Sequence, residues 1–418
     1  MKTDNMVQIN TDVLVVGGGA VGMTLAIGLA KLKKTVMLID VKPKLSVVDE
    51  QMALNRRDAR VYALNLASLN LFDGIGIGID VFQRRADYTK MQVWQGDGRG
   101  ELNFAKQSLT PRLLGSMIEP AIIDEALRQR AMQADITPYL TVLHGTWIDE
   151  HFGIDVRPKT VCVRIMNDTG WTKIVNTHLL VGADGRGSVV RRLSGIGVDT
   201  LDYHQTAICC AIKTDKAHQH TARQAMLDTG TLALLPLADM SADDGGHWQS
   251  VVWTLPTQIA KEFLALSPEN LADKLALASS FELGKIHQIQ SIASFALSAQ
   301  VAKSYIAPHT LLIGDAAHGV HPLAGQGLNL GLADVSELLA LIANDGKNIC
   351  KVGLLRQYER ARYGKNTLMM HGFSAINYAF VGKIFQKEPM RFIRSEVVNL
   401  TGKIRPLMDF FNKKASGF

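Results

Sequence analysis

Apolar residues near the amino terminus follow a pattern that predicts a strand, a tight turn, a helix and a second strand. Residues 13–16 form a continuous apolar run, which is typical of a parallel strand buried on both faces. A glycine-rich stretch follows, and a second apolar run over residues 35–39 ends at Asp40. Residues 13–30 carry no charge. Their glycines and the acids before them favour this buried unit over a membrane span or a signal peptide.

The turn after the first strand fits the spacing of a dinucleotide-binding motif. Gly17, Gly19 and Gly22 match G-x-G-x-x-G. In this motif the first glycine permits the tight turn, the second lets the backbone approach a pyrophosphate, and the third lets the helix pack on the strand. Asp40 lies 18 residues after Gly22, where a carboxylate accepts hydrogen bonds from ribose hydroxyls. We predict that these four residues bind a dinucleotide, and the motif does not separate NAD from FAD.

Two later apolar runs also end at glycine-rich turns. The first precedes Asp184 and Gly185, and a helix is expected to begin at Ser188. The second, residues 311–313, precedes Gly314 and Asp315. A stretch rich in glycine and proline then leads into a helix expected to begin near Gly327. From this stretch we single out His321, Pro322, Gly325, Gly327 and Asn329.

The order of the three motifs resembles that of the single-component flavin-dependent aromatic hydroxylases, which have the fold of para-hydroxybenzoate hydroxylase. More narrowly, the sequence resembles the ubiquinone-biosynthesis hydroxylases, which act on polyprenylated phenols. This narrower resemblance is carried by residues 58–64, 232–237, 251–256 and 321–332. The sequence departs from the subfamily at Glu119–Pro120, where Glu-Asn is usual, and at Ala225–Met226, where Arg-Phe is usual.

The resemblance implies that FAD is the cofactor and that NADPH or NADH is a co-substrate that binds transiently. It implies that Arg60 contacts a phosphate and leaves the same role open for Arg191. Asp184 and Gly185 are expected near the FAD pyrophosphate and in the path of the reductant.

For the third motif, the resemblance implies that Gly314 and Asp315 lie at the ribityl chain, with Asp315 accepting hydrogen bonds from its hydroxyls. It also implies contacts with the isoalloxazine ring, and the expected residues are His321, Pro322, Gly325, Gly327 and Asn329. No side chain is assigned a certain catalytic role, and the part played by His321 is left open.

The implied reaction is hydroxylation of the aromatic ring of a polyprenylated phenol in ubiquinone biosynthesis. NAD(P)H reduces FAD, molecular oxygen forms a flavin hydroperoxide, and the phenol attacks the distal oxygen. This chemistry requires neither a protein nucleophile nor a metal ion, and we expect no metal site. Three alternatives stay open: hydroxylation of another aromatic substrate, a different enzyme of the same fold, and a flavoprotein assembly subunit of a quinone-biosynthesis complex.

The expected fold class is α/β, with a Rossmann-like FAD-binding domain, an inserted and mainly antiparallel substrate domain, and a helical C-terminal region. The FAD-binding domain is discontinuous and is predicted over residues 1–75, 101–190 and 295–345. The substrate domain is predicted over residues 76–100 and 191–294. The helical region is predicted over residues 346–418.

Composition agrees with a globular enzyme, since 47% of the 418 residues are hydrophobic and 20% are charged. The net charge of +6 is concentrated in residues 355–418, which contain twelve Lys or Arg against four Asp or Glu. Basic and apolar residues alternate there, so this region is predicted either to contact a membrane surface or to pack on the enzyme or another subunit. We expect no nucleic-acid partner.

The four cysteines lack metal-ligand spacing, which favours buried free thiols in a reducing cytoplasm. The expected location is therefore cytoplasmic, with peripheral contact to the inner face of the cytoplasmic membrane as an additional hypothesis. Other ubiquinone-biosynthesis proteins and a second copy of the chain are partners that the sequence leaves open.

Overall fold

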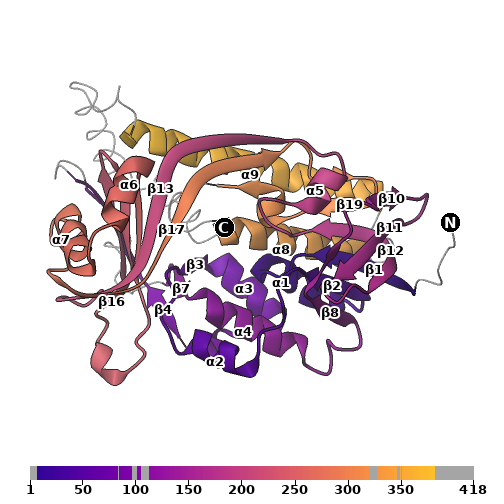
Figure 1. The fold of residues 1–418 in the computed structure, drawn as a ribbon, viewed down its shortest axis with the longest axis horizontal. Helices are drawn as coiled ribbons and strands as arrows, with labels where there is room; N and C mark the ends of the chain where they lie inside the picture. The colour runs from indigo at the N-terminus through magenta and orange to yellow at the C-terminus, as the bar shows by residue number, and fades with distance from the viewer. Residues whose placement is uncertain are drawn as a thin grey trace.

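The computed structural model describes residues 7–82, 84–96, 101–104, 113–320, 327–345, 349 and 351–381. These residues form an α/β fold with two large sheets and one small sheet (Figure 1). The predicted fold class is confirmed. Helix α9, Val352–Val381, is the described part of the predicted helical C-terminal region, and residues 382–418 lie outside the described residues.

The nine-stranded sheet of the described chain is built around a parallel row. Strands β8, β2, β1, β12 and β19 are neighbours in that order and run parallel. Antiparallel strands complete the sheet. Its members are β1 Gln8–Val16, β2 Val36–Asp40, β8 Leu140–His144, β9 Thr146–Ile148, β10 Ile154–Val156, β11 Val161–Asn167, β12 Thr172–Gly182, β18 Ile306–Ala307 and β19 Thr310–Leu312.

Buried helices cover this sheet because their inward residues are almost all apolar or small. Every residue of α1, Ala20–Lys31, from Gly22 to Ala30 is buried. Helix α8, Gly327–Asp345, packs on α1, and α9 packs on α8. The remaining helices near this sheet are α2 Val47–Leu54, α3 Leu66–Gly74, α4 Pro120–Ala131 and α5 Val189–Leu193.

The second large sheet has eight strands and is mainly antiparallel, as predicted for the substrate domain. In Figure 1, β13 and β17 arch across the molecule from the first sheet to the second. The strands are β5 Lys90–Gln95, β6 Glu101–Phe104, β13 Val198–Thr214, β14 Thr221–Leu227, β15 Gly230–Pro236, β16 Trp248–Pro256, β17 Ile286–Ala302 and β20 His318–Gly319.

Both faces of this eight-stranded sheet are covered. One face packs against helices α6, Thr257–Leu264, and α7, Pro268–Ala278. The opposite face packs against a three-stranded sheet of β3 Tyr62–Asn65, β7 Gly115–Ile118 and β4 Arg85–Tyr88. Adjacent residues of a strand point to opposite faces, so Cys209 and Cys210 lie in different cores.

Strand pairing corrects two of the expected domain boundaries. The boundary between residues 100 and 101 separates β5 from β6, yet Trp94 of β5 pairs with Glu101 of β6. The boundary between residues 294 and 295 cuts through β17, which pairs with β13 along most of its length. A boundary inside a hydrogen-bonded ladder would break it. We therefore propose that the substrate domain includes β6 and all of β17.

No helix in the described part of the chain is long and apolar enough to cross a membrane. This agrees with the interpretation of residues 13–30 as a buried strand, turn and helix, which the structure confirms as β1 and α1.

We predict that the free energy of unfolding falls between pH 6.5 and 4 because of His218. Burial, together with the charge of the nearby His220, lowers the pKa of this histidine from its usual 6.5 to about 4. The unfolded chain therefore binds a proton that the folded protein excludes, so this contribution is complete above pH 6.5 and is lost as the pH falls through 4. Urea unfolding at several pH values should show a flatter profile for His218→Gln than for the parent protein.

The matched control is His144→Gln, because His144 is exposed. Its profile should follow that of the parent protein. Parallel profiles for His218→Gln and the parent would contradict the prediction.

Candidate functional site

The three predicted motifs meet in one row at the edge of the first sheet. Val16 of β1 pairs with Gly182 of β12, and Gly182 pairs with Leu312 of β19. The strands are parallel, so their carboxyl ends lie at the same edge and the three following turns are neighbours. Ligands of open α/β sheets bind at such an edge. The pairing therefore brings together residues that are about 300 positions apart in the chain.

The first turn is shaped by close backbone approach. A Cβ atom on Gly22 would lie 2.0 Å from the carbonyl oxygen of Gly17, and one on Gly17 would lie 2.4 Å from that of Ala183. A Cβ atom on Gly19 would meet no described atom within 4 Å. Gly17 and Gly22 are thus required by the fold, whereas Gly19 borders open space at the start of α1. A pyrophosphate fits there, because the free N–H groups of a helix start bind phosphate.

Asp40 ends β2 beside this turn and is buried. Its Oδ1 accepts a hydrogen bond from the backbone N–H of Lys42 at 3.0 Å. A Cβ atom on Gly18 would lie 2.5 Å from its Oδ2. The absence of a side chain at Gly18 therefore lets the carboxylate reach the glycine turn, in the place predicted for ribose recognition.

The carboxylate of Asp184 is hydrogen-bonded within the protein. Its carboxylate accepts hydrogen bonds from Ser188 Oγ at 2.5 Å and from the backbone N–H groups of Val189 at 2.7 Å and Val190 at 3.2 Å. It therefore caps helix α5. Gly185 has a φ of +78°, and a Cβ atom there would meet no described atom within 4 Å. This glycine is the part of the second motif that stays open to a ligand.

The two arginines considered for phosphate contacts have different surroundings. Arg191 is buried and donates to the carbonyl oxygens of Ala316 at 2.7 Å and Arg186 at 2.8 Å. It joins the second motif to the third through these two hydrogen bonds. Arg60 is exposed, and its guanidinium carbon lies 4.8 Å from the centre of the Phe295 ring. Arg60 therefore remains the candidate for a ligand contact.

Asp315 projects from a short 3₁₀ turn, Gly314–Ala316. Gly314 and Ala316 are buried, whereas Asp315 is exposed. Within the part of the chain that the structure describes, no residue donates a hydrogen bond to its carboxylate. A free carboxylate on a turn held by buried neighbours fits an acceptor for the ribityl hydroxyls of FAD.

The side chain of Asn329 is likewise hydrogen-bonded inside the protein. Its Oδ1 accepts from Ser68 Oγ at 2.7 Å and from the backbone N–H of Asn65 at 3.1 Å, and its Nδ2 donates to the carbonyl of Ala63 at 2.7 Å. It fastens the start of α8, which begins at Gly327 as expected, to β3 and α3. His321, Pro322 and Gly325 lie outside the described residues.

A buried acid that the sequence analysis did not identify lies behind the third motif. Asp334 of α8 is fully buried and is bonded to His318, Arg362, Asn366 and the backbone of Gly314. Burial raises the pKa of this carboxyl, but the charges and hydrogen bonds of His318 and Arg362 outweigh that effect and lower it to about 2. The signal in the sequence was an acid with leucine four residues before and after it on a helix.

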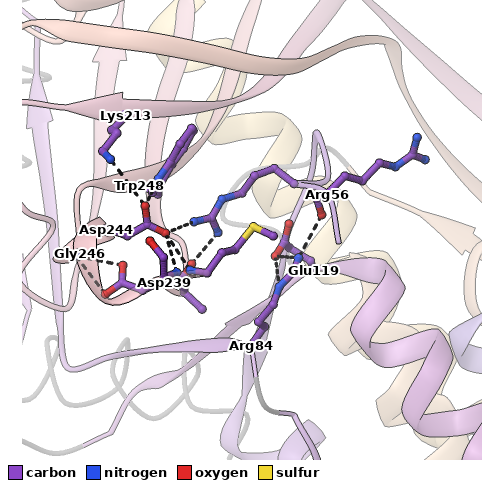
Figure 2. A network of polar contacts seen from close by, with 12 residues as sticks. Arg56, Arg84, Glu119, Lys213, Asp239, Asp244, Gly246 and Trp248 are labelled. Carbon is purple, nitrogen blue, oxygen red and sulfur yellow. Dashed lines mark hydrogen bonds and ion pairs between the residues drawn. The ribbon is translucent and has the colours of Figure 1, made fainter. Parts of the chain in front are cut away.

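Glu119 holds the segment that leads to Arg60. Its Oε1 accepts the backbone N–H of Asp58 at 2.7 Å. Its Oε2 accepts Arg84 Nε at 3.2 Å, and Figure 2 shows Arg84 beside Glu119. Pro120 is the first residue of α4, a position that suits proline because its missing N–H would have no helical partner. The departure from the usual Glu-Asn pair therefore removes an amide, yet it keeps the glutamate in a structural role.

The side chain of Arg57 extends from the FAD-binding domain to the substrate domain. It donates to the carbonyl of Ala238 at 2.5 Å and to Asp244 at 3.3 Å, and its guanidinium carbon lies 4.8 Å from the centre of the Trp248 ring (Figure 2). Ser291 of β17 donates to its backbone carbonyl at 2.7 Å. The segment that carries Arg60 is therefore held in place by the contacts of Arg57 with the substrate domain.

Beside Arg60, the eight-stranded sheet presents small and apolar side chains. Ala207 of β13 pairs with Phe295 of β17, and Cys209 pairs with Val252 of β16, so these four side chains share one face. Burial raises the pKa of Cys209 to about 11, and the charge of Arg60 opposes this shift. This face is an apolar wall with one cation at its border.

The strand row, the open glycine turn and the free Asp315 carboxylate together define an FAD-binding fold with a substrate sheet beside it. Comparison with known proteins agrees, since the profile of the FAD binding domain family matches residues 10–370. The chain belongs to this family and is an FAD-dependent enzyme of the aromatic hydroxylase kind.

Individual relatives are similar to this chain along nearly its whole length. The chain is 31% identical over 411 residues to ubiquinone hydroxylase UbiL of Rhodospirillum rubrum, covering 97% of this chain and 89% of that protein. It is 29% identical over 391 residues to 3-demethoxyubiquinol 3-hydroxylase of Escherichia coli, covering 92% and 93%. Among solved structures, p-nitrophenol 4-monooxygenase PnpA of Pseudomonas putida has a TM-score of 0.74 at 16% identity, covering 99% of both chains. This last similarity concerns the fold.

We predict that Gly19→Val abolishes FAD binding without unfolding the protein. Gly19 has φ −67° and ψ 175°, a conformation that valine accepts, and the space beside it is open in the protein. The new side chain would occupy the place of the pyrophosphate. Flavin titration of the apoprotein should show an affinity at least about tenfold weaker, with an unchanged unfolding midpoint.

Gly78→Val is the matched control, because Gly78 has φ −63° and ψ 154° and its Cβ position is also open. It should bind FAD as the parent protein does. Undiminished FAD binding by Gly19→Val would show that the glycine turn has been misinterpreted.

Proposed function

We propose that this protein is an NAD(P)H-using FAD monooxygenase that hydroxylates the ring of a polyprenylated phenol in ubiquinone biosynthesis. The observation that carries the proposal is the apolar wall of Ala207, Cys209, Val252 and Phe295 beside the FAD-binding row of motifs. The names of the relatives that match along nearly all of this chain support the choice of substrate.

The protein's own contribution is to bind, orient and exclude water. FAD, when bound, supplies the redox chemistry by accepting a hydride from NADPH or NADH and activating molecular oxygen. The residues that would hold it are those of the glycine turn, Asp40, Gly185, Arg60 and Asp315. The apolar wall would take the aromatic ring by burial of its surface, and it offers few groups to retain water against the reacting carbon.

The wall also accounts for the kind of substrate that this site would select. Ala207 and Cys209 are small and buried, and they pack with Leu297 in one apolar cluster on this face. No residue of the four-residue wall is charged at neutral pH, since the pKa of Cys209 is raised to about 11, so a neutral phenol is favoured over a strongly charged acid. Arg60, at the border, is the nearby cation that would interact with an electron-rich ring or a developing phenolate.

We predict that the oxygen atom added to the product comes from molecular oxygen. Purified protein with FAD, NADPH and a polyprenyl phenol under ¹⁸O₂ should yield a hydroxylated product that carries one labelled oxygen, as mass spectrometry would show. The control is the same mixture in H₂¹⁸O under unlabelled oxygen, which should give an unlabelled product. Label from water, or reduction of FAD with release of peroxide only, would exclude the proposed reaction.

We also propose that the basic C-terminal region places the enzyme on the inner face of the cytoplasmic membrane. Residues 382–418 lie outside the described residues, so the argument rests on sequence and substrate. Lysine and arginine near an anionic surface contribute about 1 kcal/mol each, and each buried CH₂ group of a prenyl chain contributes about 0.8 kcal/mol, which would keep the substrate in lipid.

Truncation after Gly382 should therefore abolish salt-sensitive binding to anionic vesicles while FAD stays bound. Cosedimentation with vesicles measures the first property, and the flavin absorbance of the soluble fraction measures the second. Neutral vesicles are the control and should bind both proteins weakly. Equal affinity of the full chain for neutral and anionic lipid, or full binding by the truncated protein, would refute the membrane proposal.

A further inference from the structure

Asp334 uses both oxygens of a fully buried carboxylate, and each oxygen has two partners. Oδ2 accepts the backbone N–H of Gly314 at 3.0 Å and lies 2.5 Å from His318 Nε2. Oδ1 accepts Arg362 Nε at 2.7 Å and Asn366 Nδ2 at 3.0 Å. A carboxylate can accept at all four positions, whereas an amide can accept at only two. Gly314, Arg362 and Asn366 are donors, and Arg362 is a cation, so the arrangement suits an ionised acid.

The two partners of Oδ2 stand at opposite ends of the turn that carries Asp315. Gly314 begins the turn and His318 follows it, and both are buried. Between them, Asp315 is exposed. Gln300 of β17 donates to the backbone carbonyl of Asp315 at 2.8 Å. The turn is thus held at both ends by one oxygen atom and in the middle by its main chain, which fixes the backbone from which the exposed side chain projects.

Helix α9 holds the carboxylate from the other side. Arg362 Nη2 also donates to Asn366 Oδ1 at 2.8 Å, so the two α9 partners are themselves joined. Tyr358 of the same helix donates to the carbonyl of Leu312 at 3.1 Å, at the end of β19. Helix α9 and helix α8 therefore fix the strand end and the turn as one unit.

We propose that Asp334 is a positioning residue for FAD, which sets the place of the Asp315 carboxylate through Gly314 and His318. The proposal rests on the FAD site described above, in which Asp315 binds the ribityl chain. Binding is strengthened when the acceptor is already held where the ligand needs it, because no order is then lost on association. Among the residues that the structure describes, the network makes no contact with the open side of the turn, so Asp334 acts through Asp315.

A double-mutant cycle on FAD affinity tests this statement. Asp315→Ala should weaken FAD binding about tenfold or more, since an acceptor is lost. Asp334→Asn should also weaken it about tenfold, because the amide cannot satisfy the turn and Arg362 together. In the Asp315→Ala background, Asp334→Asn should change the affinity by less than about twofold, since its effect is transmitted through the missing side chain.

Titration of the apoproteins with FAD gives the four affinities, and unfolding of the same apoproteins separates positioning from stability. Asp149→Asn is the matched control, because Asp149 is a buried carboxylate paired with Arg164 of β11. It should lower the unfolding midpoint and leave the FAD affinity unchanged. If Asp334→Asn does not fold, Asn366→Ala, which removes a single bond to Oδ1, replaces it in the cycle.

The outcomes are distinguishable. If the two substitutions act independently, the fold-changes in FAD affinity of Asp334→Asn and Asp315→Ala multiply in the double variant. That result would overturn the positioning role of Asp334 and leave the FAD site intact. An unchanged affinity in Asp334→Asn would overturn it too. An unchanged affinity in Asp315→Ala would instead remove the assignment of the ribityl contact, and with it the basis of the proposed site.

Discussion

The parallel pairing of β1, β12 and β19 is the constraint on which the site depends. Val16, Gly182 and Leu312 lie in one row across the sheet, so three turns from distant parts of the chain emerge side by side. Each turn then fulfils a different requirement: an open backbone at Gly19, a freely accessible Gly185 and a free carboxylate at Asp315. A slip of one residue in either pairing would separate them, because register fixes which groups reach the edge.

The second determinant is the connection between the two large sheets. Strands β13 and β17 extend over both, and Arg57 reaches from the first domain to Asp244 and Trp248 of the second. The segment that carries Arg60 lies between these contacts. The apolar wall and the row of cofactor motifs therefore keep a fixed position relative to each other. A hydroxylase needs this because the reacting carbon must be held close to the bound cofactor.

The sequence predicted the parts of the site that depend on local backbone geometry. Strand, turn and helix around Gly17 follow from glycine spacing and apolar runs, and the structure confirms them as β1 and α1. The hydrogen-bond partners of side chains were predicted less well, because they come from segments that are distant in the chain. Asp184 and Asn329 bind protein groups, and Asp334 was not identified because its partners on α9 are 28 and 32 residues away. Residue type alone does not reveal which donors reach a buried acceptor.

The buried thiol in the apolar wall also affects how well the enzyme resists chemical modification. Burial raises the pKa of Cys209 to about 11 and that of Cys210 to about 12. At neutral pH a thiol with a pKa near 11 is ionised in only about one molecule in ten thousand, and the thiolate is the form that attacks electrophiles. Hydroxylated phenols oxidise readily to quinones, which alkylate thiolates. A cysteine that stays protonated beside such a product would let the enzyme survive repeated exposure to it.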